Sequence, residues 1–228
     1  ATTATATPRV QEDIIEQVGT DLIPVRGQLL RSNIRLFVVT VQSEDEKFFW
    51  LAEYLPKLKK TGIVYTGTQA NTDIFSNWLQ FLKFNSAAYS GRLDAESRMR
   101  VESDFINNKY DCVVSTNALG MGIDKPDIRF IIHTQIPQSP IHYYQEIGRS
   151  GRDGQEAFAI LLYNPTEDQE LPKSFIDGSK PSASKYEKVI AVTKKALLGR
   201  NEIIKATNLK QTQVSVILAD LIDQKIIN

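Results

Sequence analysis

The feature that most constrains the fold is an alternation, from about residue 34 onward, of short β-branched runs with longer amphipathic stretches. This alternation is typical of β-α units that feed a mostly parallel sheet. The predicted strands span residues 34–41, 62–66, 86–89, 111–115, 130–134 and 157–163. Apolar residues at three- and four-residue spacing predict helices over residues 46–59, 72–84, 95–107 and 141–150.

Two of the predicted strands are nearly continuous apolar runs. Residues 62–66 read Gly-Ile-Val-Tyr-Thr, and residues 112–115 read Cys-Val-Val-Ser. Strands that helices cover on both faces have this composition. We therefore expect an open α/β sandwich, with a mostly parallel sheet covered by helices on both faces. The aromatic residues at helical spacing, Trp50, Trp78 and Phe81, are expected in its core rather than in a base-stacking platform.

With 228 residues, of which 42% are hydrophobic, the chain can bury one full core and a small second one. Single domains cluster near ~100–200 residues. Residues 165–184 break the pattern with three prolines and a glycine, which predicts a linker. The following residues, 185–228, carry eight Lys and Arg against four Asp and Glu. Their periodic segments, 201–207 and 212–224, flank a short turn and predict a helix-turn-helix.

Several classes of protein are disfavoured by simple counts. Cys112 is the one cysteine, so an intramolecular disulfide and a multi-thiolate zinc site cannot form, and a cytosolic or nuclear location is expected. No run approaches the ~20 apolar residues of a membrane span. Basic and acidic residues balance at 27 each, so any nucleic-acid contact must come from local patches. A start without Met favours a trimmed fragment.

The most informative string, at residues 145–154, is Gln-Glu-Ile-Gly-Arg-Ser-Gly-Arg-Asp-Gly. Arg149 and Arg152 lie three residues apart, so on a helix they point the same way, and the glycines allow a phosphate or a partner domain to approach. Arginine offers a permanent charge and a planar fork of donors, which suits a transferring γ-phosphoryl group. A solvated basic turn is the alternative for this string taken alone.

A second string, at residues 115–128, is Ser-Thr-Asn-Ala-Leu-Gly-Met-Gly-Ile-Asp-Lys-Pro-Asp-Ile. Gly120 and Gly122 permit close backbone approach, so their loop can present N–H groups to a nucleic-acid phosphate while Asp124 faces a nucleotide. A tight strand-to-helix turn would explain the glycines but not the whole string.

Together with His-Thr-Gln-Ile-Pro-Gln-Ser-Pro at 133–140 and Tyr-Tyr-Gln-Glu at 143–146, these strings resemble motifs V and VI of the RecQ family of DNA helicases. Met-Gly-Ile-Asp-Lys-Pro and Tyr-Tyr-Gln-Glu favour that family over DEAD-box RNA helicases. Residues 3–8, 62–68 and 88–93 resemble motif III, motif IV and the family's Ala-Tyr-His-Ala-Gly-Leu segment. The resemblance runs from residue 3 to about residue 163.

The resemblance implies a domain organisation. Residues 1–32 would be a remnant of a first RecA-like domain, and residues 33–164 a second RecA-like domain. After the 165–184 linker, residues 185–228 would be a truncated winged-helix-like segment. Family members usually carry a four-cysteine zinc module after the second domain, which this sequence cannot form.

The resemblance also implies roles at the nucleotide. Arg149 and Arg152 would reach the γ-phosphate of ATP bound on the first domain, with Arg152 as the arginine finger. The other residues expected at the ATP cleft are Gln145, Asp124, Gly122 and Gly148.

The path of single-stranded DNA would be lined by Thr66, Ser90, Arg92, Thr116 and Asn117. Ser90 stands where the family has His, and Arg92 replaces a smaller residue. In the C-terminal segment, residues 212–224 would be a recognition helix, with Lys205, Lys210, Gln211 and Gln213 near duplex DNA. A small helical protein-interaction subdomain is an equally good interpretation. His133 and His142 are expected to form hydrogen bonds rather than to bind metal or act in catalysis.

The implied activity is an ATP-dependent DNA helicase that moves 3′ to 5′ on single-stranded DNA and separates duplexes. ATP and Mg²⁺ would be bound mainly by the absent first domain, because the sequence contains no G-x-x-x-x-G-K-[ST] string. The chain alone is expected not to hydrolyse ATP, and its expected partners are DNA and that first domain, not a membrane. Two alternatives are an RNA helicase of the same superfamily and a catalytically inactive DNA-binding module.

Overall fold

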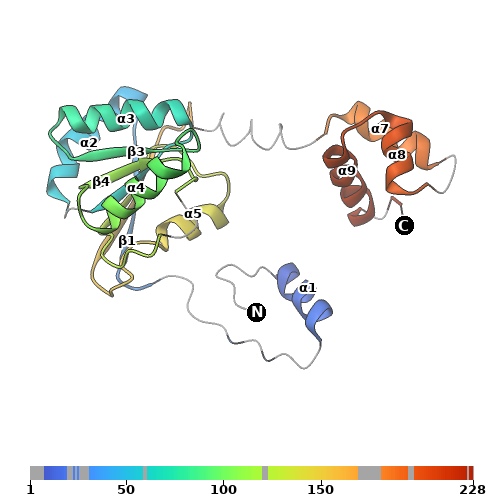
Figure 1. The fold of residues 1–228 in the computed structure, drawn as a ribbon, viewed down its shortest axis with the longest axis horizontal. Helices are drawn as coiled ribbons and strands as arrows, with labels where there is room; N and C mark the ends of the chain where they lie inside the picture. The colour runs from blue at the N-terminus through green and yellow to red at the C-terminus, as the bar shows by residue number, and fades with distance from the viewer. Residues whose placement is uncertain are drawn as a thin grey trace. The chain divides into compact units, whose positions relative to one another are not determined.

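The computed structural model describes residues 8–19, 23, 25, 31–58, 61–119, 123–168, 181–194, 198–224 and 226–227. The chain divides into two compact units, Ala1–Pro172 and Lys173–Asn228. The larger unit is built around a sheet and the smaller one is helical (Figure 1). The predicted remnant of a first domain is described only in part, as helix α1 (Pro8–Val18) and a few residues after it, while most of the motif III string lies outside the described residues.

The larger unit contains a six-stranded sheet in which every neighbouring pair of strands is parallel. The strand order is β1-β6-β5-β2-β4-β3. The strands are β1 (Ile34–Thr40), β2 (Gly62–Tyr65), β3 (Ser86–Tyr89), β4 (Cys112–Ser115), β5 (Phe130–His133) and β6 (Ala157–Tyr163). All six predicted strands are therefore confirmed, each end within one residue of its predicted position.

The predicted helices between the strands are also confirmed. They are α2 (Glu44–Tyr54), which runs into a 3-10 turn (Leu55–Lys57), α3 (Gln69–Phe81), α4 (Ala95–Ile106) and α5 (Pro140–Ile147). Helices α2 and α3 begin earlier than predicted because Ser43 and Thr68 cap them. Their side chains accept hydrogen bonds from Glu46 N at 3.3 Å and Asn71 N at 3.2 Å.

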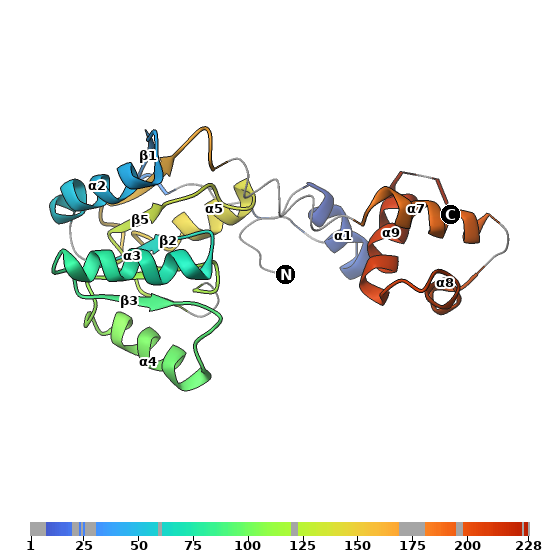
Figure 2. The same cartoon turned by 90° about the horizontal axis from the view of Figure 1, so that it is seen from above.

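Alternation along the buried strands sends successive side chains to opposite faces of the sheet. Ile63, Val113 and Ile131 face one side, where they pack with α4, α5 and the loop between β4 and β5. Their neighbours Val64, Val114 and Ile132 face the other side, where they pack with α2 and α3. Helices thus cover both faces (Figures 1 and 2), and the predicted α/β architecture is confirmed.

Strand β1 is an edge strand that pairs with β6 alone. Its first residue, Ile34, is buried in the core, but Leu36, Phe37 and Val38 are exposed. Phe37 contacts Phe158 of β6 at a ring separation of 6.2 Å. The outer edge of the sheet therefore presents apolar side chains to solvent.

The turn after β6 is tied to α2 by a buried ion pair. Lys47 is fully buried, and its Nζ lies 2.6 Å from Asp168 Oδ1 and 2.5 Å from Glu44 Oε1. Asp168 also accepts from the Asn164 backbone N–H at 2.7 Å. The first residues of the predicted linker, 165–168, are thus packed on the sheet domain, whereas residues 169–180 lie outside the described residues.

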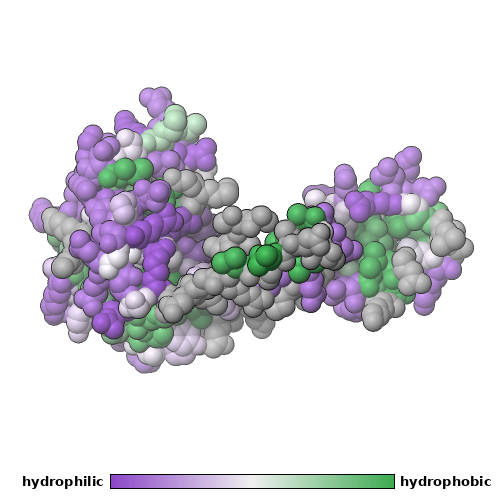
Figure 3. Space-filling view, turned by 90° about the horizontal axis from the view of Figure 1, so that it is seen from below, coloured by the Kyte–Doolittle hydropathy of each residue, from purple (hydrophilic) through white to green (hydrophobic). Residues whose placement is uncertain are grey.

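The smaller unit contains three helices among its described residues, α7 (Ala183–Thr193), α8 (Arg200–Thr207) and α9 (Gln211–Asp223). The two helices of the predicted helix-turn-helix are α8 and α9, joined through Asn208 in the left-handed conformation. Their small core also includes Val189 of α7, a helix that the sequence pattern did not indicate. Apolar residues are visible on the surface of this unit (Figure 3). Val216 and Ile222 are among its exposed apolar residues.

None of the described helices is long and apolar enough to cross a membrane.

Candidate functional site

Three of the predicted nucleic-acid residues follow three adjacent strands. Tyr65, Ser115 and Tyr89 are paired in register at the ends of β2, β4 and β3. Thr66, Thr116 and Ser90 come directly after them. Because carboxyl ends of parallel strands share one edge of the sheet, these residues form a row there.

The hydroxyl groups of this row are used inside the protein. Thr66 Oγ1 donates to Thr68 O at 3.1 Å and lies 3.0 Å from Thr72 Oγ1. Thr116 Oγ1 accepts from Ala118 N at 3.3 Å. All three residues of the row are buried, and Ser90 accepts from the backbone of Arg92. They shape the loops beyond the strands, in which Arg92 and Asn117 are exposed.

The loop that carries Arg149 and Arg152 follows α5, which ends at Gly148. Gly151 has a φ of +60°, and a Cβ on it would lie 2.5 Å from Asn33 Nδ2 and 3.0 Å from Gln155 O. An L side chain is therefore disfavoured at this position by both conformation and space.

Two residues that precede β1 hold this loop. Arg31 donates from Nη2 to Gly148 O and from Nη1 to Ser150 O, both at 2.7 Å. Asn33 Nδ2 donates to Gly151 O at 2.8 Å and to Gln155 O at 2.7 Å. The entry of the chain into the sheet domain therefore positions the arginine loop, although well over a hundred residues separate them in the sequence.

Arg129 holds the same loop from the side of β5. Its Nη2 lies 2.5 Å from Asp153 Oδ2, and its Nη1 donates to Glu156 O at 3.2 Å. The bond from Arg129 lowers the pKa of Asp153 below its ordinary value. Arg31 and Arg129 thus bind groups of the loop itself. Arg149 and Arg152 are the two arginines that the loop carries.

Arg152 forms an ion pair with Asp124 of the loop between β4 and β5. The Arg152 side chain is 34% exposed and the Asp124 side chain 83% exposed. An ion pair this open to solvent contributes little to stability, so either partner can exchange to another ion at low cost. The predicted cleft residue Asp124 therefore lies beside the predicted arginine finger.

Arg149 lies over a buried polar cluster. Its Nε is buried and has no hydrogen-bond partner among the described residues. Burial raises the pKa of the nearby Tyr65, and the charge of Arg149 opposes that rise. Arg149 thus interacts with Tyr65 in the core of the sheet domain.

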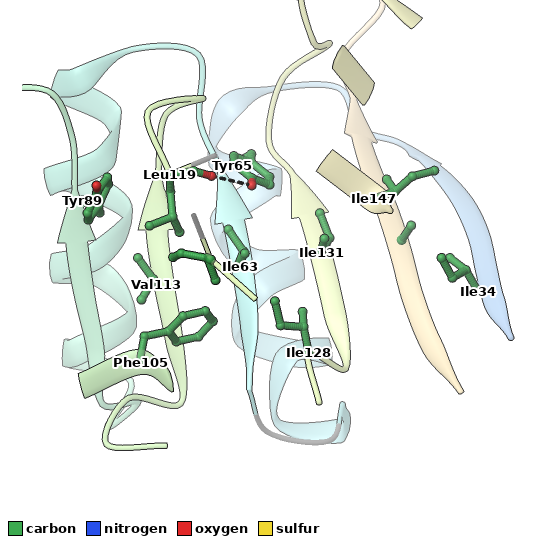
Figure 4. Close-up of a cluster of buried hydrophobic side chains, with 12 residues drawn as sticks. Ile34, Ile63, Tyr65, Tyr89, Phe105, Val113, Leu119, Ile128, Ile131 and Ile147 are labelled. Carbon is green, nitrogen blue, oxygen red and sulfur yellow. Dashed lines mark hydrogen bonds between the residues drawn. The ribbon is translucent and has the colours of Figure 1, made fainter. Parts of the chain in front are cut away.

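The cluster beneath Arg149 joins β5 to α5. His133 Nε2 lies 2.8 Å from Glu146 Oε2, and both side chains are buried. Tyr65 stacks on the His133 ring at 5.2 Å, and its hydroxyl donates to Leu119 O at 3.0 Å (Figure 4). This set of contacts links the strand of motif IV to the loop of motif V and the helix of motif VI.

Other predicted cleft residues are placed less completely. Gly122 lies outside the described residues, as do Gly120 and Met121. Gln145 is exposed on α5, where it interacts with another group of the protein. Gly148 caps α5 and supplies the carbonyl that Arg31 binds. The structure thus brings Asp124 and Arg152 together, and Gly148 and Arg149 directly follow α5.

Lys125, next to Asp124, is buried and structural. Its Nζ binds Asn108 Oδ1 and Asp127 Oδ1, both at 2.7 Å, and lies over the Phe105 ring. Burial alone would raise the pKa of Asp127, but the bonds from Lys125 and Asn108 hold it below its ordinary value. This lysine fixes the loop that presents Asp124.

Of the predicted DNA contacts of the C-terminal unit, Lys205 lies in the last turn of α8 and the others lie at the start of α9. Lys210 is exposed and precedes the helix, and Gln213 accepts from the Lys210 backbone N–H at 3.4 Å. Gln213 is therefore a capping residue, whereas Lys205, Lys210 and Gln211 are exposed.

The expected hydrogen-bonding roles of the histidines are confirmed, His133 with Glu146 and His142 Nδ1 with Ser139 Oγ at 2.8 Å. Among the described residues no group of three His, Cys, Asp or Glu side chains could hold a metal ion. Burial raises the pKa of the Cys112 thiol to about 12. The expected core position of Phe81 is wrong, since this side chain is 72% exposed, while Trp50 and Trp78 are half-buried.

Sequence reasoning missed the residues that position the arginines, above all Arg31, Arg129 and the pair of His133 with Glu146. The sequence could have indicated Glu146, because it lies three residues before Arg149 and is therefore close to it in space. No sequence signal connects Arg31 to a loop so distant in the chain.

Residues 46–154 match the helicase conserved C-terminal domain family. The chain is 37% identical over 169 residues to the ATP-dependent DNA helicase RecQ of Bacillus subtilis, covering 73% of this chain and 28% of that protein. It is 35% identical over 198 residues to the probable ATP-dependent DNA helicase RecS of the same bacterium, covering 86% of this chain and 40% of that protein. The chain thus spans well under half the length of these relatives.

Among solved structures, the yeast DEAD-box splicing factor Prp28 shares the fold, with a TM-score of 0.59 and 24% identity over 77% of this chain and 39% of that one. The fold, the arginine loop and the family match define the class, which is a helicase C-terminal domain. Within that class, the chain belongs to the RecQ family.

Proposed function

We propose that this chain is the second motor domain of an ATP-dependent DNA helicase that moves 3′ to 5′ on single-stranded DNA and separates duplexes in repair or recombination. The observation that carries the proposal is the arginine loop. Arg31 and Asn33 bind its backbone and Arg129 binds Asp153, whereas Arg149 is partly exposed and Arg152 is exposed.

The donor set fits a nucleotide phosphate. Arg149 is only partly buried, and Arg152 is held by an exposed carboxylate that a phosphate can replace. Bound Mg²⁺ would neutralise phosphate charge, with ligands from the first domain of the parent protein. We infer that Arg152 exchanges Asp124 for the γ-phosphate when the two motor domains close, which couples nucleotide binding to domain movement.

The DNA path in this proposal runs over the row at the carboxyl ends of β2, β4 and β3. The buried hydroxyls of Thr66, Ser90 and Thr116 fix the loops, and Asn117 and Arg92 contact phosphates. The C-terminal unit would add a duplex contact through Lys210, with Gln213 fixing the helix start. Such an enzyme works in the bacterial cytoplasm or the eukaryotic nucleus.

The test is ATP turnover by the parent protein that includes the first motor domain, with and without single-stranded DNA. We expect DNA to stimulate turnover and Arg152→Ala to reduce it by roughly 10³-fold or more. Arg100→Ala, an exposed arginine of α4 outside the site, is the control and should leave turnover unchanged. Full DNA-stimulated turnover in the Arg152→Ala protein would remove the arginine finger from the mechanism.

The same assay separates the alternatives. RNA that stimulates turnover better than DNA of the same sequence would favour an RNA helicase. Tight DNA binding without any stimulated turnover would favour a catalytically inactive DNA-binding module. The RecQ relatives favour DNA, because both carry DNA helicase in their names and resemble this chain more closely in sequence than the DEAD-box fold neighbour does.

A further inference from the structure

An apolar groove lies between α2 and α3, on the face of the sheet opposite to α5 and the arginine loop. It has a volume of about 610 Å³ and is lined mainly by Phe48, Phe49, Ile74, Trp78 and Phe81. Phe49, Ile74 and Phe81 are 70%, 52% and 72% exposed. The two helices lie side by side in Figure 2. Large apolar side chains gathered in this way are typical of an interaction site.

The groove is preformed by a series of ring contacts. Phe48 stacks on the buried Phe75 at 4.4 Å and meets Trp78 edge-on at 5.8 Å. Trp78 stacks on Phe81 at 5.6 Å, and its indole N–H donates to Phe48 O at 3.2 Å. The aromatic side chains are therefore held in place before any ligand arrives, which lowers the entropy cost of binding.

Carboxylates predominate on the two helices that form the groove. Helices α2 and α3 carry the carboxylates Glu44, Asp45, Glu46, Glu53 and Asp73. Their one basic residue, Lys47, is buried and paired with Glu44 and Asp168. Asp45 itself lines the groove, and Asp73 lies beside Ile74 on the exposed side of α3. A phosphate backbone or an anionic lipid surface would be repelled there, whereas Lys and Arg side chains would be attracted.

We propose that this groove binds a basic amphipathic helix from a partner protein. Apolar side chains at positions i, i+3 or i+4, and i+7 of that helix would fill the space between Phe49, Ile74 and Phe81. Its Lys and Arg side chains would face Asp45 and Asp73. The proposal is independent of the motor function, because the groove uses none of the residues assigned to ATP or DNA.

The test uses the 228-residue chain and a fluorescent 18-residue peptide with Leu and Phe on one helical face and Lys and Arg on the other. Binding is followed by fluorescence anisotropy at low and at physiological salt. A peptide with Glu in place of every basic residue, and a scrambled peptide that has the same composition but no apolar face, are the controls. Single-stranded DNA and vesicles of anionic lipid are tested alongside.

We expect the basic amphipathic peptide alone to bind saturably, and more tightly at low salt. Phe81→Ser should weaken binding about tenfold or more. The double substitution Asp45→Asn with Asp73→Asn should weaken it several-fold and reduce its salt dependence. Met99→Ser, at a similarly exposed apolar residue of α4, is the matched control and should leave binding unchanged.

Several outcomes would overturn the proposal. These are no binding of the basic peptide, equal binding of the acidic peptide, or binding that Phe81→Ser does not weaken. Preferential binding of DNA or of vesicles through this groove would also overturn it. A dimer of the chain that Phe81→Ser dissociates would show that a second copy, rather than a basic helix, occupies the groove.

Discussion

The two faces of the sheet are built from the same alternating strands but differ in what they bury. On the α5 face, polar groups lie inside the core, with His133 against Glu146 and Tyr65 against the Leu119 carbonyl. On the α2 and α3 face, the contacts are aromatic and end in an open groove. The comparison shows that directed hydrogen bonds connect strands, loop and helix on the face of the arginine loop, whereas apolar ring contacts shape the face that carries the groove.

The largest expected effect compares two phenylalanines on α3. Phe75 is buried against Phe48, so Phe75→Ala should lower the free energy of unfolding by about 3–5 kcal/mol. Phe81 is exposed, so Phe81→Ala should change it by no more than about 0.5 kcal/mol. Urea unfolding of both variants measures the difference. Equal losses of unfolding free energy would mean that Phe81 contributes to the core as much as Phe75 does.

A second prediction concerns the polar face. Glu146→Ala leaves buried His133 without its partner and should cost about 1–3 kcal/mol of stability. Exposed Glu53→Ala is the control and should cost less than about 1 kcal/mol. A double-mutant cycle with His133→Ala should show a coupling energy of about 0.5–3 kcal/mol. Strict additivity of the two substitutions would show that the pair does not act as a unit.

These contrasts separate what the sequence could predict from what it could not. The strands followed from runs such as Cys112–Ser115, because periodicity of two or continuous apolarity is a local property. The proximity of Asp124 to Arg152 followed from motif order and resemblance alone. The bonds of Arg31 and Asn33 to the arginine loop depend on tertiary placement, so no local pattern reveals them. Phe81 was misplaced because helical spacing does not tell which apolar positions a neighbouring element covers.

Two glycines of the arginine loop provide a sharper comparison. Gly151 and Gly154 both have positive φ, but a Cβ on Gly151 would meet Asn33, whereas a Cβ on Gly154 would meet open space. Gly154→Ala should cost about 1–2 kcal/mol for its left-handed conformation, and Gly151→Ala should cost more. Thermal unfolding of both variants, and of Gly151→Ala combined with Asn33→Ala, measures the steric part. Equal costs would contradict a tight contact with Asn33.

The smallest expected effect is on pH dependence. The pKa of Asp153 is lowered in the folded chain, so the stabilisation from its bond with Arg129 is present above the ordinary aspartate pKa of 3.8 and is lost as the pH falls through the lower folded value. Asp153→Asn should therefore flatten the decline in stability below about pH 4. Chemical denaturation between pH 2 and pH 6 tests this, and an unchanged slope would contradict it.

The pairing of β1 with β6 has a consequence for synthesis of the chain. Ile34 pairs with Ala157 and Thr40 with Tyr163. Strand β1 is synthesised first, so it cannot pair until β6, the last strand of the sheet, has been synthesised. At roughly 5–20 residues per second, that wait lasts several seconds or longer on the ribosome. During it, Leu36, Phe37 and Val38 form an unpaired apolar segment, while β2 to β5 can already assemble. The interval before β6 emerges is therefore when a nascent chain most needs protection from aggregation.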